Sequence, residues 1–416
     1  MKVVFVEASS GSVVGGSLTG MLELLRGIDR ARITPSVVLY EHKPCIGELR
    51  ERGIPVTVVS RRVLPKTHAL QESTAYAGAR NVRAVASALQ LLRRSATFAA
   101  ETLPSALRLR AAMAPFAPDL VYACNGFRGN SDAIVAARLV GVPCVIHAKG
   151  FDKLSWIERL LSASVAGCIS MTKAIEDHCR AGGMRPGFFE VIYDGLDLAA
   201  FRPKRASAEV RRELGLAADC EVAGVVGNIQ PWKGQKVLVE ALDLLAAEKP
   251  ALVVLIVGGT HRSGAAYERE VRELVAARGL ASRVVFTGPR ADVPDLMNAM
   301  DVLVHTSVRG EPFGRVIIEG MAVARPVIAT RAGGVPEFVH DGDDAVLVEP
   351  GDAPALAREL AVLLGDPARR ETLGRAARVS AERFALPRHV ALMSRAFERA
   401  TAGRDAALHG RAKAAA

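Results

Sequence analysis

The sequence predicts an α/β protein of two domains, each built on a parallel sheet that helices cover on both faces. Short runs rich in β-branched residues alternate with Ala-, Leu- and Arg-rich segments of helical period from end to end. This alternation is typical of parallel sheets, and 416 residues are too many for one ordinary core but suit two. The strand-like runs include 2–6, 33–40, 54–59, 119–123, 143–147, 222–227, 251–257, 283–287, 301–305, 326–329 and 345–348, and the helical segments include 235–247 and 266–278.

A turn-rich passage separates the strands into two sets. It reads YDGLD at 193–197 and FRPK at 201–204. We therefore place a first domain at 1–195 and a second domain at 205–378. Residues 402–416 are rich in Ala, Gly and Arg, and we expect them to form a disordered tail.

The composition is that of a globular protein, with 50% hydrophobic and 24% charged residues. The longest stretch without a charge, 8–22, is too short and too polar to cross a bilayer, which takes about 20 apolar residues. Met1 and Lys2 lead directly into a strand-like run, without the basic region and cleavage site of a secretion signal. We therefore expect a cytoplasmic protein.

Neither a metal nor a bound cofactor is expected. The six cysteines stand singly, without a C-x-x-C pair, which argues against a disulfide framework or a zinc site and favours reduced, buried thiols. No His, Asp or Glu cluster has metal-ligand spacing, and neither a G-x-S-x-G nor a P-loop motif occurs.

The net charge of +10 is concentrated in residues 61–110, where nine Lys and Arg accompany two Glu, and nine minus two leaves +7. This basic zone predicts an anionic partner, either a membrane surface or an acidic substrate. Between Arg80 and Arg94 the apolar residues share one helical face, which fits a core helix with a solvated basic back as well as a surface for anionic lipid headgroups. The zone lacks interleaved aromatic residues, so we do not expect nucleic acid as a partner.

The segment 301–339 carries the strongest functional signal. A strand ends at His305, and a helix is predicted to start at Glu311-Pro312, because proline suits the first helical position. A helix start at the carboxyl end of a parallel strand is an anion site. Glu311 and Glu319, roughly 12 Å apart along a helix, would accept hydroxyls from the two ends of a nucleotide sugar. The alternative is that Glu311 only favours the helix dipole and Glu319 is solvated.

Glycine-containing loops accompany this segment. Gly333-Gly334 follow the next strand, where consecutive glycines would let a ligand approach the backbone, although an ordinary tight turn has the same sequence. In the loop 225–234 (VVGNIQPWKG), Gly227 ends a strand and Lys233 would reach an anion above it and stabilise a departing diphosphate. A solvated lysine is the alternative there.

In the first domain, the loop 8–19 contains Gly11, Gly15 and Gly16 but no G-x-G-x-x-G. It is therefore a weak dinucleotide fingerprint, and we expect it to line the cleft between the domains. His147 ends a strand, where it would position or polarise a hydroxyl or serve as a structural histidine.

Taken in order, these motifs resemble the retaining glycosyltransferases of family 4, which carry an E-x7-E motif. The resemblance covers nearly the whole chain and implies two Rossmann-like domains that face each other across a cleft (GT-B), with the donor bound mainly by the second. It rests on EPFGRVIIEGMA at 311–322, PVIATRAGGVPE at 326–337, Gly15-Gly16, His147, 191–197, 227–234 and 350–352.

The resemblance implies a role for each matching residue. Glu311 would contact the donor sugar, Glu319 the ribose and Lys233 the diphosphate, while His147 would lie near the transferred sugar. Catalytic residues would thus be Glu311, Lys233 and His147. The donor-binding residues would be Gly15, Gly16, Gly227, Asn228, Phe313, Gly314, Arg315, Val316 and Glu319. The family usually needs no metal, and its last helix, here 379–401, often crosses back onto the first domain.

The sequence departs from the family pattern at three positions. Asn228 replaces the usual Arg and removes a positive charge from the diphosphate site, while Asp194 and Ala324 replace a common Asn and Gly. The predicted function is transfer of a sugar from a nucleotide-sugar donor to a hydroxyl of a glycan or lipid-linked acceptor in cell-surface polysaccharide biosynthesis, on the inner face of the membrane. The alternatives are a nucleotide-sugar epimerase of the same fold and a degenerate nucleotide-binding subunit, which only Asn228 favours.

Overall fold

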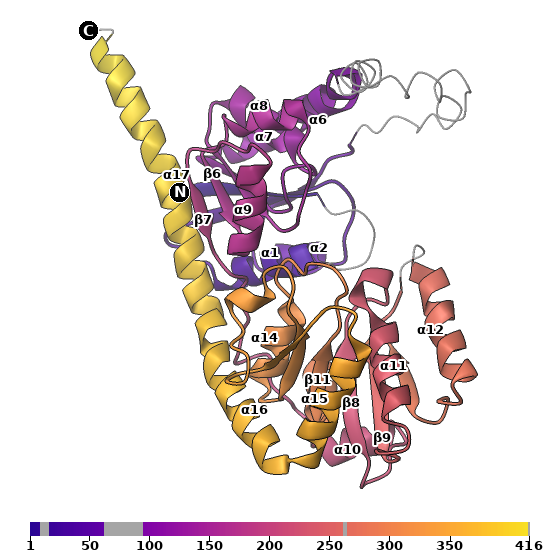
Figure 1. Cartoon of the computed structure of the whole chain (residues 1–416). Helices are drawn as coiled ribbons and strands as arrows, with labels where there is room; N and C mark the ends of the chain where they lie inside the picture. The colour runs from indigo at the N-terminus through magenta and orange to yellow at the C-terminus, as the bar shows by residue number, and fades with distance from the viewer. Residues whose placement is uncertain (9–15, 62–94, 261–263, 415–416) are drawn as a thin grey trace, which may run out of the picture. The chain divides into compact units, whose positions relative to one another are not determined.

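The computed structural model describes residues 1–8, 16–61, 95–260 and 264–414 (Figure 1). Gly15 and most of the basic zone 61–110 lie outside these residues. The chain forms two compact units, and the first is assembled from both ends of the chain. The first unit comprises Met1–Met171, Ile175–Ile192 and Val390–Ala416, and the second comprises Thr172–Ala174 and Tyr193–His389.

The first unit contains a seven-stranded parallel sheet with the order β3-β2-β1-β4-β5-β6-β7. Strands β1 and β4 are buried almost throughout because helices cover both faces of the sheet. The strands are β1 (Lys2–Glu7), β2 (Thr34–Leu39), β3 (Val56–Val58), β4 (Leu120–Ala123), β5 (Cys144–Ala148), β6 (Gly167–Ser170) and β7 (Phe189–Val191). The helices of this half of the chain are α1 (Gly16–Gly27), α2 (Ile46–Glu51), α6 (Leu103–Met113), α7 (Ser131–Val140), α8 (Trp156–Ser162) and α9 (Lys173–Ala181).

The second unit contains a six-stranded parallel sheet with the order β10-β9-β8-β11-β12-β13. Apolar residues of its strands and helices form one continuous buried core. The strands are β8 (Glu221–Val226), β9 (Leu252–Val257), β10 (Val284–Gly288), β11 (Val302–His305), β12 (Val327–Thr330) and β13 (Val346–Val348). The helices are α10 (Ser207–Glu213), α11 (Gln235–Leu244), α12 (Ala265–Ala277), α13 (Val293–Ala299), α14 (Arg315–Ala322), α15 (Ala353–Gly365) and α16 (Pro367–Ala381).

These two sheets confirm the predicted fold class of two Rossmann-like α/β units. In each sheet the strand order reverses once, between β1 and β4 in the first and between β8 and β11 in the second. Loops that leave the carboxyl ends of the strands at such a switch point diverge, and ligands of open α/β sheets bind there.

Helix α17 (Leu386–Ala414) begins in the second unit and from Val390 onward belongs to the first. Phe397 is fully buried and packs against Phe5, with ring centroids 6.2 Å apart, and against Tyr122, at 5.1 Å. The helix also includes most of 402–416, for which a disordered tail was predicted. Ala and Arg are frequent in this segment and rank among the best helix formers, so the helix continues.

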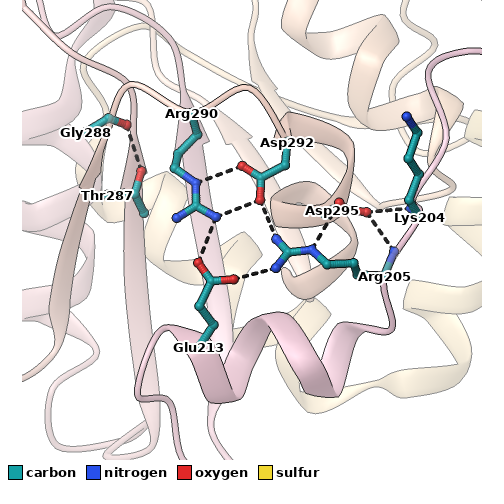
Figure 2. Close-up of polar contacts among 8 residues, drawn as sticks. All are labelled: Lys204, Arg205, Glu213, Thr287, Gly288, Arg290, Asp292 and Asp295. Carbon is teal, nitrogen blue, oxygen red and sulfur yellow. Dashed lines mark hydrogen bonds and ion pairs between the residues drawn. The ribbon is translucent and has the colours of Figure 1, made fainter.

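An ion-pair cluster anchors the chain where it enters the second unit (Figure 2). Asp295 Oδ1 accepts hydrogen bonds from the backbone N–H groups of Lys204 (2.6 Å) and Arg205 (3.0 Å). The Arg205 guanidinium also contacts Asp292, Asp295 and Glu213, and Arg290 pairs with Asp292 and Glu213. The hydrogen bond from Arg290 lowers the pKa of Asp292 to about 2, so this carboxyl is ionised and fully available to the cluster at neutral pH.

Candidate active site

The switch point of the second sheet brings two predicted segments together. Strands β8 and β11 are paired neighbours, so the loops after Val226 and His305 leave the same edge of the sheet. The two loops are joined by hydrogen bonds, from Thr306 Oγ1 to the Lys233 carbonyl (2.8 Å) and from the Val308 N–H to the Trp232 carbonyl (2.9 Å). Lys233 and Glu311 therefore lie on loops that hold each other in place.

Lys233 and Glu311 form a partly buried ion pair. The distance from Lys233 Nζ to Glu311 Oε2 is 2.7 Å, and the side chains are 19% and 8% exposed. Lys233 Nζ also lies 4.1 Å from the centre of the Trp232 ring. Burial alone would raise the pKa of Glu311, but the hydrogen bond from His305 and the charge of Lys233 outweigh it and hold the pKa well below its usual range. Glu311 is consequently an ionised hydrogen-bond acceptor.

The predicted helix start at Glu311-Pro312 is wrong, because α14 begins at Arg315. Gly314 precedes the helix with φ of +82°, a left-handed conformation that cannot continue a helix. Residues 311 and 312 are held outside the helix because the Glu311 carbonyl accepts from the Gly334 N–H (2.9 Å) and the Pro312 carbonyl accepts from Thr172 Oγ1 (2.9 Å). The helical spacing assumed for the two glutamates therefore does not apply.

Gly333 and Gly334 pack directly against the backbone of Glu311 and Pro312. A Cβ at Gly333 would meet the Glu311 carbonyl oxygen at 2.2 Å, and one at Gly334 would meet the Pro312 carbonyl oxygen at 2.6 Å. The glycines thus make room for the backbone that presents Glu311, whereas the sequence suggested that they make room for a ligand.

Glu319 is neither solvated nor alone. Arg315 Nε donates to Glu319 Oε1 at 2.9 Å, and both side chains are 17% exposed. Arg315 Nη1 also donates to the Gly195 carbonyl at 3.2 Å. Glu319 thereby keeps one carboxylate oxygen in an ion pair on the first turns of α14.

The other predicted donor-binding residues of this unit have mixed environments. The Phe313 side chain is 1% exposed and packs in an aromatic cluster with Tyr193, Phe338 and Phe384, so only its backbone is available to a ligand. Gly227 follows β8, and the Asn228 side chain next to it is exposed. Val316 lies in the first turn of α14 and is half-buried.

Two predicted residues, Gly16 and His147, belong to the first unit. Gly16 begins α1, and a Cβ there would meet nothing within 4 Å. His147 is 1% exposed near the carboxyl end of β5, and its Nδ1 lies 2.6 Å from the Tyr122 hydroxyl. The sequence missed Glu7, which ends β1 fully buried and accepts from Ser17 Oγ at 3.1 Å. Its position, a carboxylate at the carboxyl end of a strand beside the switch point, was the available signal.

The sequence also missed His305 and Ser307, which contact Glu311, and Thr330, which contacts His305. His305 Nε2 lies 3.1 Å from Glu311 Oε2, and Ser307 Oγ lies 2.8 Å from the same oxygen. The signal in the sequence was weak: His305 and Thr330 are each a polar residue at the end of an apolar strand-like run. His147, which also lies at a strand end, was predicted as a site residue, whereas His305 was not.

Among the described residues, no three or more His, Cys, Asp or Glu are arranged to hold a metal ion. No helix in the described part of the chain is both long and apolar enough to cross a membrane. All six cysteines are free, and five are buried.

Two protein-family models match the chain. Residues 207–380 match the model described as glycosyl transferases group 1, and residues 45–200 match glycosyltransferase family 4. The chain belongs to this glycosyltransferase family. The group 1 match contains the whole second sheet, and the family 4 match contains β3 to β7 of the first sheet, so both halves of the chain carry family features.

Curated relatives include D-inositol 3-phosphate glycosyltransferases of two Streptomyces species. The protein of Streptomyces bingchenggensis is 34% identical over 262 residues, which cover 61% of this chain and 57% of the relative. The protein of Streptomyces avermitilis is 39% identical over 204 residues, which cover 48% of this chain and 44% of the relative. The chain thus spans about half the length of the curated relatives it matches.

Solved structures match over nearly the full chain. Anabaena Alr3699/HepE in complex with UDP-glucose superposes with a TM-score of 0.75 and 25% identity, covering 94% of this chain and 99% of that one. Sucrose-phosphate synthase of Thermosynechococcus elongatus has the same fold, with a TM-score of 0.73 and 21% identity, covering 97% of this chain and 100% of that one. These structures support the GT-B fold class of this glycosyltransferase.

Proposed function

We propose that this glycosyltransferase moves a sugar from a UDP-sugar to a hydroxyl of a glycan or lipid-linked acceptor, with retention of the anomeric configuration. The observation that carries the proposal is the contact between Lys233 and Glu311 at the β8/β11 switch point. A cation for a diphosphate and an ionised acceptor for sugar hydroxyls lie together where α/β sheets bind ligands. We infer uracil as the base of the donor because the similar Anabaena structure holds UDP-glucose.

In this proposal the protein acts mainly through charge and position. Lys233 stabilises the negative charge that develops on the departing diphosphate as the bond between the sugar and the phosphate breaks. Glu311 accepts hydrogen bonds from the sugar, and Glu319 accepts them from the ribose through the oxygen that Arg315 leaves free. His147 orients the transferred sugar, and Gly16 contributes to donor binding. A nucleotide-binding subunit without transfer is the second candidate, favoured by the neutral, exposed Asn228.

A thermal-shift series tests donor binding and the role of Glu319. UDP, GDP, ADP and dTDP sugars are each added to the wild type and to Glu319→Ala. A ligand at about 100 times its Kd stabilises the folded state by about 2.7 kcal/mol, so we expect UDP sugars to raise the melting temperature by several degrees and Glu319→Ala to reduce that rise.

The matched control is Glu371→Ala, which also removes a glutamate paired with an arginine four residues away on a helix. This variant should retain the full ligand-induced rise. Equal rises in Glu319→Ala and the wild type would refute the ribose contact. No rise with any nucleotide sugar would refute donor binding altogether.

We also propose that the protein works in the cytoplasm, bound peripherally to the inner face of the membrane, in cell-surface polysaccharide biosynthesis. Two helices that both pack on α7 expose apolar side chains four residues apart, namely Leu103 (39% exposed) and Leu107 (48%) on α6, and Trp156 (41%) and Leu160 (67%) on α8. Exposed arginines accompany them, Arg108 and Arg110 on α6 and Arg159 on α8. Apolar and basic groups on one helix are typical of membrane-surface helices.

Vesicle co-sedimentation tests this surface. The double change Leu107→Glu and Leu160→Glu is expected to weaken binding to phosphatidylglycerol vesicles at least about tenfold, since burying one Leu is worth about 1.5–3 kcal/mol. Val379→Glu, at a side chain 73% exposed in the second unit, serves as the control and should bind as the wild type does. Binding that the double change leaves unaltered would exclude these helices as the membrane contact.

A further inference from the structure

Two uncharged side chains, His305 and Ser307, contact the carboxylate of Glu311, and a third, Thr330, contacts His305. His305 is 2% exposed at the end of β11, Ser307 follows it in the loop, and Thr330 is 2% exposed at the end of β12. Strands β11 and β12 pair with His305 opposite Ala329, so Thr330 lies one residue further along the neighbouring strand. The sheet itself thus fixes the histidine and the threonine relative to each other.

The hydrogen bonds of this group have one consistent assignment. Glu311 is ionised and can only accept. Ser307 has a single hydroxyl hydrogen, which it donates to Glu311 Oε2 at 2.8 Å. The single Nε2–H of His305 is then shared between Ser307 Oγ, at 3.0 Å, and Glu311 Oε2, at 3.1 Å. His305 Nδ1 is then unprotonated and accepts from Thr330 Oγ1 at 3.3 Å.

The environment of His305 agrees with this assignment. Burial lowers the pKa of His305 below its usual value, although the hydrogen bond and charge of Glu311 act in the opposite direction. A neutral ring with its hydrogen on Nε2 satisfies every neighbour, whereas a hydrogen on Nδ1 would leave Nε2 and Glu311 Oε2, two acceptors, facing each other at 3.1 Å.

The consequence for Glu311 is an asymmetric carboxylate. Lys233 Nζ (2.7 Å), Ser307 Oγ (2.8 Å) and His305 Nε2 (3.1 Å) all point to Oε2. Within the described part of the chain no hydrogen bond to Oε1 is recorded. One oxygen is therefore saturated by the protein while the other is left to accept.

We propose that His305 is a positioning residue for the donor sugar: together with Ser307 and Thr330 it fixes Glu311 so that Oε1 alone faces the sugar hydroxyls. The inference rests on the proposed function, because it assigns Oε1 to the donor. His305 itself touches no substrate and acts through the carboxylate. Without its Nε2–H the carboxylate is held by Lys233 and Ser307 only and turns more freely about its last torsion.

A pair of conservative variants separates positioning from packing. In His305→Gln the amide nitrogen replaces Nε2 and reaches Glu311, while in His305→Asn the amide replaces Nδ1 and reaches only Thr330. We expect His305→Asn to weaken UDP-glucose binding about fivefold to tenfold, the usual net contribution of one hydrogen bond, and to slow UDP release from UDP-glucose in water. Affinity for UDP, which lacks the sugar, should stay within about twofold. His305→Gln should recover most of the loss.

The control is Asp295→Asn, which weakens the ion-pair cluster of the same unit and should lower the melting temperature without changing the ratio of UDP-glucose to UDP affinity. Thr330→Val, nearly isosteric, gives a second reading if His305→Asn does not fold, and should shift the same ratio by about threefold. Equal ratios in the wild type, His305→Asn and Thr330→Val would overturn the inference while leaving the proposed function intact. A wild type that binds neither UDP nor UDP-glucose would overturn the proposed function, and the inference with it.

Discussion

Replacing Lys233 with Ala is expected to lower turnover of a UDP-sugar about 100-fold to 1,000-fold, the usual effect of removing one group that stabilises developing charge. Lys233 is the cation that contacts Glu311 at the switch point, and its ammonium group would meet the departing diphosphate. The change also removes a positive charge beside the buried Glu311, so the pKa of that carboxyl should rise toward its usual range. The measurement is steady-state release of UDP from UDP-glucose.

Lys236→Ala provides the comparison for this result. Lys236 stands three residues further along, pairs with Glu270 at the surface and takes no part in the proposed site. Its loss should leave turnover unchanged. Similar rates of UDP release in Lys233→Ala and Lys236→Ala would show that Lys233 has no role in the mechanism.

Replacing Asp295 with Ala is expected to lower the free energy of unfolding of the second unit by about 2–3 kcal/mol. Asp295 is 6% exposed and accepts from the backbone N–H groups of Lys204 and Arg205 and from the Arg205 side chain. The alanine leaves these donors without their acceptor and releases the segment that leads into α10 (Figure 2). Urea denaturation followed by circular dichroism measures the change.

Glu371→Ala removes an exposed partner of an ion pair and should cost no more than about 0.5 kcal/mol. A loss of stability in Asp295→Ala that does not exceed this control would show that solvent replaces the carboxylate and that the cluster in Figure 2 adds little to the fold.

The sheets could be predicted from the sequence because strands buried on both faces are continuous apolar runs. Strands β6 (GCIS) and β7 (FEV) were not predicted, because they are only four and three residues long and lack such a run. The start of α14 could not be predicted, since proline at 312 favoured an early start. In the structure the left-handed Gly314 and the tertiary hydrogen bonds from Gly334 and Thr172 hold residues 311 and 312 outside the helix.

The site was predictable as separate motifs but not as an arrangement. Lys233 and Glu311 were each predicted as site residues because each lies in a loop that follows a strand. Their 2.7 Å contact, however, depends on β8 and β11 being neighbours in the sheet, which no local sequence pattern encodes. His305 and Thr330 were missed for a related reason. Each is a single polar residue at the end of its own strand, and only strand pairing brings Thr330 to the His305 ring that contacts Glu311.

The packing of Phe397 on Phe5 and Tyr122 has a consequence for synthesis on the ribosome. Domains generally fold as units while the chain emerges, and the one nearest the N-terminus usually folds first. The core of the N-terminal sheet includes the Phe397 ring, which is translated almost last. All strands of the second sheet, β8 to β13, are translated before Phe397. The second unit can therefore complete its core first, and an interrupted translation would yield a folded second unit attached to an incomplete first unit.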